Sequence, residues 1–255
     1  MKKCSFFALI CALVLAAAPA FAATELSVFA AASMRESMTE IAALYEKAVP
    51  DVKIVYNFDS SGTLKTQIEQ GAECDIFISA AQKQMNEVND KFVLPGSRFN
   101  LVANVVVLIV PKGNNPTHID SFADAATDKV RLIVLGNSDV PVGQYSEEIF
   151  KYLKIWDKLN AEKKITFASN VKEVLAQTAS AAASCGVVYG TDAATNKDVE
   201  VVADAPKDSH KPVIYPAAIM KDTKNKAAAE AFMKYLHGKE ATEVFKKVGF
   251  AIPEK

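Results

Sequence analysis

The chain alternates between short apolar runs and longer amphipathic stretches. In residues 34–48, apolar side chains recur every three or four positions and place Met38, Ile41 and Tyr45 on one helical face. The first block of the pattern predicts strands at 26–30, 52–58 and 75–79 and helices at 34–48 and 64–69. This order of strands and helices is typical of a parallel sheet covered by helices. Ligands of such sheets bind beyond the carboxyl ends of the strands.

A long apolar run at residues 101–110 separates this block from a second one. The run is longer than one buried strand requires, so we expect it to pass from one lobe of the protein into another. The second block predicts strands at 130–135, 165–168 and 186–189 and helices at 144–153 and 171–183. Residues 213–220 are again apolar and are expected to return to the first lobe, which amphipathic helices at 225–236 and 239–248 complete.

The first 22 residues have the three parts of a secretory signal peptide. Lys2 and Lys3 form a basic start, residues 6–18 are apolar without a charge, and Ala20-Phe21-Ala22 is a small-x-small cleavage site. The apolar run is short for a membrane span. We therefore expect residues 1–22 to be removed on export and the mature chain to start near Ala23.

Two of the four cysteines lie inside this segment. Cys11 follows Ile10, which is not the small residue that lipoprotein processing needs, so a lipid anchor is disfavoured. Cys74 and Cys185 remain after cleavage, in a compartment that permits a disulfide. They precede strands that are predicted to belong to different lobes, and a bridge would fix the lobes together. We expect two unpaired, packed thiols.

Four predicted helix starts come directly after strand-like segments. Ser33 is expected to be an N-cap, with Glu36 completing a capping box. The other starts are Ser60-Ser61-Gly62, Pro141-Val142-Gly143 and Ser169-Asn170-Val171. Free backbone N–H groups at a helix start bind anions, and several together can hold a doubly negative oxyanion without lysine or arginine. For any single helix start, helix capping is a better explanation than anion binding. All four starts, however, directly follow strand-like segments, and this shared position favours an oxyanion receptor.

Tyr189 ends the apolar strand Val187-Val188-Tyr189. A buried phenol requires a hydrogen-bond partner. Tyr189 therefore either donates to an anion or packs half-exposed against the sheet, and the sequence leaves both interpretations open.

Signals for other functions are weak. The net charge of −1 indicates no nucleic-acid or membrane-surface partner. Ser169 and Lys172 match Ser-x-x-Lys, so a secreted serine hydrolase is the alternative from another class, although no Lys-Thr-Gly accompanies the pair. The chain has neither a Gly-x-Ser-x-Gly elbow nor a phosphate-binding P-loop, and its three histidines and its cysteines lack metal-ligand spacing. We expect no catalytic residue, no cofactor and no bare metal cation.

Several motifs, in their order and spacing, resemble the periplasmic molybdate-binding protein family, and the resemblance covers essentially the whole mature chain. The first is Val28-Phe29-Ala30-Ala31-Ala32-Ser33, and the second is Phe58-Asp59-Ser60-Ser61-Gly62-Thr63-Leu64. The remaining motifs lie at residues 71–80, 140–143, 186–193 and 249–250.

The resemblance implies an α/β fold of the type II periplasmic-binding class, with two lobes, each a mainly parallel sheet flanked by helices, around a ligand cleft. We expect the first lobe to comprise residues 23–105 and 212–255 and the second lobe to comprise residues 106–211. It implies a periplasmic monomer that binds molybdate and tungstate and delivers them to the membrane permease of an ATP-driven importer. Sulfate, thiosulfate and phosphate are the alternative oxyanions. By motif position, the implied ligand residues are Ser33, Ser61, Val142, Val171 and Tyr189, the valines through their backbone N–H groups.

Two positions depart from the family pattern. Asp59 stands where relatives commonly carry a small residue, and its carboxylate would repel a dianion unless it turns away or holds a proton. It would alternatively accept a proton from hydrogen phosphate. Val142 stands where some relatives carry alanine, a change that keeps the N–H donor.

Overall fold

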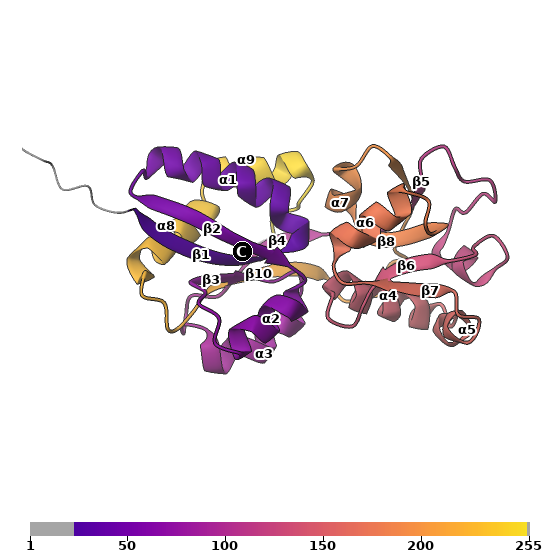
Figure 1. Cartoon of the computed structure of the whole chain (residues 1–255), viewed down its shortest axis with the longest axis horizontal. Coiled ribbons are helices and arrows are strands. Elements are labelled where there is room, and N and C mark those ends of the chain that lie inside the picture. The colour runs from indigo at the N-terminus through magenta and orange to yellow at the C-terminus, as the bar shows by residue number, and fades with distance from the viewer. Residues whose placement is uncertain (1–22, 254–255) are drawn as a thin grey trace, which may run out of the picture.

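The computed structural model of the chain describes residues 23–253. The predicted signal peptide lies outside these residues. The strands of the described part form two five-stranded sheets, each covered by helices, and the two resulting lobes lie side by side along the long axis of the molecule (Figure 1). No helix of residues 23–253 is long and apolar enough to cross a membrane.

The first sheet has the strand order β2-β1-β3-β10-β4. Its central strand β1 is parallel to β2 and β3, whereas β10 is antiparallel to both β3 and β4. The strands are β1 Thr24–Ala31, β2 Val52–Asp59, β3 Ile76–Ile78, β4 Phe99–Asn104 and β10 Val213–Ile219. The helices of this first lobe are α1 Arg35–Ala48, α2 Ser61–Glu69, α3 Gln82–Phe92, α8 Lys226–Leu236 and α9 Lys239–Val248, with the short 3-10 helix η1 Ala32–Met34 between β1 and α1.

Strand β1 is buried on both faces, which explains its continuous apolar sequence. Val28 and Ala30 belong to the core beneath α1, α8 and α9. Phe29 points to the other face and packs with Leu64 and Met85 of α2 and α3. Helices therefore cover both sides of the sheet, and the carboxyl end of β1 delivers the chain to the edge that faces the second lobe (Figure 1).

The second sheet repeats this plan with the strand order β7-β6-β8-β5-β9. Strand β6 is parallel to β7 and β8, and β5 is antiparallel to its neighbours β8 and β9. The strands are β5 Val106–Pro111, β6 Ile133–Gly136, β7 Ile165–Ala168, β8 Cys185–Tyr189 and β9 Val199–Asp204. The second lobe also contains η2 Phe122–Ala126, α4 Pro141–Tyr152, α5 Trp156–Ala161, α6 Val171–Ala179 and α7 Gly190–Ala194.

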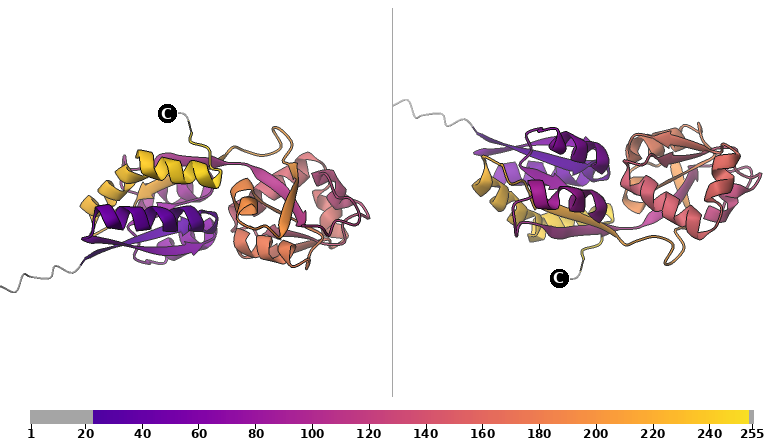
Figure 2. Two further views of the ribbon diagram at one scale, coloured as in Figure 1. Left: turned by 90° about the horizontal axis from the view of Figure 1, so that it is seen from above. Right: turned by 90° about the horizontal axis from the view of Figure 1, so that it is seen from below.

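The apolar run at 101–110 does cross between the lobes. It is divided at the exposed Val105 into β4 of the first sheet and β5 of the second. The chain returns to the first sheet through the segment before β10, so two stretches of backbone join the lobes (Figure 2). Within residues 23–253, Cys74 and Cys185 form no disulfide, and they lie in different lobes. The expected α/β fold class, with two lobes that are each a sheet flanked by helices, is confirmed. Each sheet is mixed, because the strand from the crossing segments, β10 or β5, is antiparallel to both of its neighbours.

Candidate functional site

A small cavity between the lobes gathers most of the predicted ligand residues. From the first lobe it is lined by Ala31, Ala32, Ser33, Asp59, Ser60, Ser61 and Ala80. From the second lobe it is lined by Val140, Pro141, Val171 and Tyr189. Four of the five predicted residues therefore meet there. The fifth, Val142, is fully buried in the first turn of α4, one residue beyond the lining Pro141.

Ser33 does not cap a helix, and the predicted capping box with Glu36 is wrong. The 3-10 turn η1 intervenes between β1 and α1, and neither η1 nor α1 has a side-chain cap. Ser33 is turned inward by this extra turn, and its Oγ lies 2.9 Å from Oη of the buried Tyr215. Glu36 is left free to interact elsewhere.

Ser61 is the first residue of α2, and the N-cap is its neighbour Ser60. The Ser60 Oγ accepts a hydrogen bond from the Thr63 N–H at 3.1 Å. The Ser61 Oγ accepts one from the Ala80 N–H at 2.9 Å. Since a hydroxyl both accepts and donates, this bond leaves the proton of the fully buried Ser61 hydroxyl available to a ligand.

Helices α4 and α6 present their amino ends from the second lobe. The Asn170 side chain caps α6 by accepting from the Glu173 N–H at 3.1 Å, so Val171 is the first helical residue. In α4, Pro141 is the first helical residue and has no N–H, so Val142 supplies the first N–H of that helix. First-turn N–H groups have no acceptor within their own helix.

Tyr189 carries a buried polar atom without a partner. The residue is 1% exposed, and its hydroxyl has no hydrogen bond among the described residues. Its nearest aromatic neighbour, Tyr215, meets it edge-to-face with ring centroids 5.7 Å apart. Burial raises the pKa of the Tyr189 phenol well above its usual value, so the hydroxyl remains a donor. A buried polar group left unpaired costs about 1–3 kcal/mol, and a ligand acceptor in the cavity would remove that cost.

The cavity offers donors without a cationic side chain. None of its described lining residues is lysine, arginine or histidine. Asp59, whose carboxylate would repel an anion, does line the cavity. Its Oδ1 accepts a hydrogen bond from the Ser60 N–H at 2.7 Å. One carboxylate oxygen is therefore held at the start of α2 by that amide.

The hydrolase alternative depends on a contact that the structure does not form. The Ser169 Oγ donates to Glu173 Oε2 at 2.8 Å. The Lys172 Nζ is instead bound by Glu36 and by Asp192. The serine and lysine therefore have separate partners. No group of three or more His, Cys, Asp or Glu side chains in residues 23–253 is placed to hold a metal ion.

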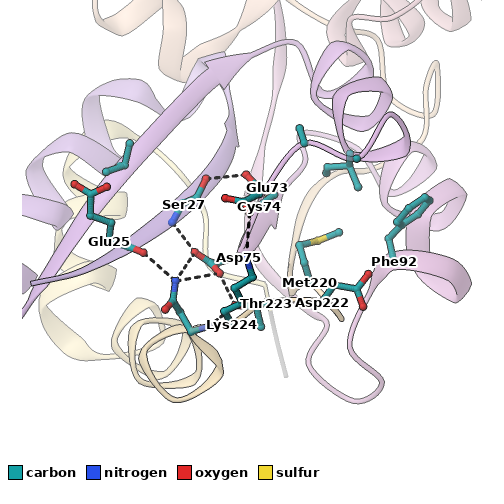
Figure 3. Close-up of a pocket in the computed structure, with 15 residues that line it drawn as sticks. Glu25, Ser27, Glu73, Cys74, Asp75, Phe92, Met220, Asp222, Thr223 and Lys224 are labelled. Atoms are coloured by element: carbon teal, nitrogen blue, oxygen red, sulfur yellow. Dashed lines mark hydrogen bonds and ion pairs between the residues drawn. The ribbon is translucent and has the colours of Figure 1, made fainter.

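Another cavity lies at the opposite end of the first sheet, where β1 and β3 begin (Figure 3). Its volume is about 460 Å³, and its lining includes Glu25, Glu73, Asp75 and Asp222 but only one lysine, Lys224. Asp75 accepts from the Ser27 N–H at 2.7 Å and thus ties β1 to β3. Four carboxyl groups disfavour an oxyanion, so this cavity is not the candidate anion site.

Comparison with known proteins places the chain in a family. The model of the bacterial extracellular solute-binding proteins matches residues 26–251. The chain belongs to this family. It is 40% identical to the molybdate-binding protein ModA of Escherichia coli over 235 residues, which cover 89% of each chain.

Solved structures of family members have the same fold. The periplasmic molybdate-binding protein of Azotobacter vinelandii matches with a TM-score of 0.81 and 29% identity, over 90% of this chain and all of that one. The substrate-binding domain of a putative molybdenum ABC transporter from Clostridium difficile matches with a TM-score of 0.69 and 38% identity, over 91% and 100%. The resemblance to the periplasmic molybdate-binding family and the type II fold are confirmed.

Three contacts that surround the cavity could not be predicted from the sequence. Tyr215 pairs with Ser33, the Ala80 N–H pairs with Ser61, and Glu36 pairs with Lys172. Tyr215 and Ser33 are 182 residues apart and Glu36 and Lys172 are 136 apart, whereas Ala80 and Ser61 are 19 apart. Ser33, Ser61 and Ala80 lie in motifs that carry the family resemblance, but the motifs do not indicate how these residues pair.

Proposed function

We propose that this protein is an exported receptor that binds molybdate between its lobes and delivers it to an ATP-driven importer. The observation that carries the proposal is the unpartnered hydroxyl of Tyr189, which lines a cavity bounded by helix starts and free of cationic side chains. An oxyanion would give this hydroxyl its acceptor. The 40% identity to the molybdate-binding protein of E. coli favours molybdate among the oxyanions.

The proposed ligand residues are Ser33, Ser61, Val142, Val171 and Tyr189. Ser61 and Tyr189 contribute hydroxyl protons, and the first turns of α2, α4 and α6 contribute backbone N–H groups. Helix-end dipoles favour the negative charge from three sides. Hydrogen bonds to a charged ligand contribute about 1.5–3 kcal/mol each.

Size would separate the oxyanions. Molybdate and tungstate are tetrahedral dianions of nearly equal size, so fixed N–H donors bind both. Sulfate is smaller, and donors held at the longer metal–oxygen distance would not all reach it.

Phosphate is the second candidate because Asp59 lines the cavity. A carboxylate beside a fully ionised dianion repels it, whereas the same carboxylate accepts the proton of hydrogen phosphate.

The proposed receptor is a two-lobed periplasmic protein. Its lobes comprise residues 23–105 with 212–255, and residues 106–211. It acts as a periplasmic monomer after removal of residues 1–22, it has no catalytic activity or cofactor, and its protein partner is the permease.

Thermal unfolding of the mature chain with molybdate, tungstate, sulfate and phosphate, each added separately, tests the proposal. A ligand at 100 times its dissociation constant stabilises the folded state by about 2.7 kcal/mol. We expect a large shift with molybdate and tungstate and a small one with sulfate. A large shift in the unfolding temperature with phosphate and none with molybdate would overturn molybdate as the ligand and identify the protein as a phosphate receptor.

A further inference from the structure

A cluster of three charged side chains crosses the gap between the lobes beside the cavity. The Lys172 Nζ lies 2.9 Å from Glu36 Oε1 and 2.8 Å from Glu36 Oε2. It also lies 2.9 Å from Asp192 Oδ1. Glu36 belongs to α1 of the first lobe, whereas Lys172 and Asp192 belong to α6 and α7 of the second.

This contact is unlike the other ion pairs of the protein. Among residues 23–253, Glu36–Lys172 is the one ion pair that joins a residue of the first lobe to a residue of the second. Lys172 follows Val171, whose first-turn position faces the cavity, and Glu36 follows Ser33 by three residues. The ion pair therefore joins α6, which begins with Val171, to α1, which directly follows the 3-10 turn that contains Ser33.

The two partners of Lys172 have different roles. The Asp192 side chain is completely buried, and its Oδ2 has no hydrogen bond to any other group in residues 23–253, so Lys172 is the cation that compensates its charge. This pair lies within one lobe and persists when the lobes separate. Glu36 is 42% exposed on the facing lobe and can leave Lys172 for water.

Access to the cavity requires such a separation. Ser61, Val171 and Tyr189 are all at most 3% exposed, so an anion cannot reach them while the lobes are together. Moving the lobes apart breaks Glu36–Lys172 and leaves Lys172–Asp192 intact.

We propose that Glu36 and Lys172 form a latch that favours the closed arrangement of the lobes and thereby slows release of the bound anion. This inference rests on the proposed function, since it assumes that an oxyanion occupies the cavity. Both side chains are positioning residues: Asp192 orients the lysine within the second lobe, and the lysine holds Glu36 of the first. If the anion binds tightly only to the closed arrangement, the observed affinity rises with the fraction of molecules that are closed.

Glu36→Gln is the informative variant, because it removes the interlobe charge pair and leaves Asp192 with its lysine. Glu40→Gln is its matched control. Glu40 lies one turn further along α1, its side chain is also 42% exposed, and it pairs with Lys247 of the same lobe at 2.9 Å. Both variants remove one negative charge from the same helix.

We expect Glu36→Gln to weaken molybdate binding by up to about 5-fold, chiefly through faster dissociation, and Glu40→Gln to leave it unchanged. Simple electrostatics predicts the opposite sign, because removing a negative charge near an anion strengthens binding. Equal affinities and dissociation rates in the two variants, or tighter binding in Glu36→Gln, would overturn the latch. Failure of the parent protein to bind molybdate would instead overturn the proposed function.

Small-angle X-ray scattering without added anion tests the latch independently of the ligand. We expect a larger radius of gyration in Glu36→Gln than in the parent and in Glu40→Gln. An unchanged radius of gyration in Glu36→Gln would overturn the latch even if molybdate binds.

Discussion

At the scale of single residues, Tyr189 links stability to function because its buried hydroxyl has no hydrogen-bond partner in the described part of the chain. Tyr189→Phe removes that hydroxyl and keeps the ring. We expect molybdate affinity to fall by about 10- to 100-fold, the equivalent of one hydrogen bond to a charged group. The free energy of unfolding without ligand should stay the same or rise, since an unsatisfied polar atom is lost.

Calorimetric titration and urea denaturation measure these two effects. Tyr145→Phe is the control, because the Tyr145 ring lies 6.5 Å from that of Tyr189 but the residue does not line the cavity. Equal affinities in the two variants would remove Tyr189 from the site.

Asp59 decides between the two candidate anions. Asp59→Asn keeps an oxygen that can accept from the Ser60 N–H and removes the charge. We expect the variant to bind molybdate more tightly than the parent, since a repulsive carboxylate has gone. Titration with phosphate provides the contrast: a loss of phosphate binding in Asp59→Asn, with molybdate unchanged, would identify Asp59 as the acceptor for a protonated ligand.

Asp192 makes the stability of the protein depend on pH. Burial raises the pKa of its carboxyl to about 6, although the Lys172 ammonium lowers it. Because this pKa is above that of the unfolded chain, the folded state gains stability from Asp192 as pH falls through about 6, and this gain is complete below about pH 4. Glu36 and Lys172 are the charged groups that face it.

Asp192→Asn should remove this dependence. We expect the unfolding free energy of the parent, relative to that of the variant, to be about 1–3 kcal/mol higher at pH 4.5 than at pH 7. Urea denaturation at both pH values measures it. A difference that is constant with pH would show that the carboxyl does not titrate in this range.

At the scale of secondary-structure elements, the first turn of α2 forms a close contact between the lobes. The Gly62 N–H donates to the Asp139 carbonyl across the gap at 2.9 Å. A Cβ at Gly62 would lie 2.4 Å from that oxygen, which is backbone and cannot swing aside. Only glycine therefore permits this approach.

Gly62→Ala tests the importance of the close approach. Alanine favours the helix by about 1 kcal/mol, so we expect the variant to be at least as stable as the parent without ligand. Molybdate affinity should fall at least 10-fold, because the lobes cannot close fully. Thermal unfolding and calorimetric titration check the two results. Undiminished affinity would show that full closure is not required.

The elements that hydrophobic periodicity predicts well are the buried ones. The predicted helix at 34–48 corresponds to α1, and the predicted strand at 186–189 matches the fully buried β8. Helix α3 was missed because most of its residues are polar and Met85 and Val88 carry its apolar face. Strand β9 was missed because it lies at the edge of its sheet and is mostly exposed. The helix predicted at 171–183 ends earlier, at Ala179.

The capping box failed for a local reason. Ser33 and Glu36 have the right spacing, but the chain makes a 3-10 turn before α1, and Tyr215 offers Ser33 a partner from a distant strand. Spacing along the sequence cannot reveal such a partner. The same holds for Ser61, whose hydroxyl accepts from Ala80 rather than capping α2.

At the scale of the whole molecule, the order of strands and helices predicts two lobes, but it does not predict how the lobes meet. Glu36 and Lys172 are 136 residues apart, and Gly62 and Asp139 belong to different lobes. Their contacts depend on how the two lobes are placed relative to each other. The helix starts could be predicted because each follows a strand of a parallel sheet, which sets its position at one edge.

A tetrahedral oxyanion is proposed to bind between the lobes at the helix starts. A crystal structure of the mature chain grown with molybdate, with anomalous diffraction recorded at the molybdenum absorption edge, would locate the anion. We expect one strong anomalous peak within hydrogen-bonding reach of Ser61, Val171 and Tyr189. A peak at another site, or none in crystals that contain the anion, would contradict the account.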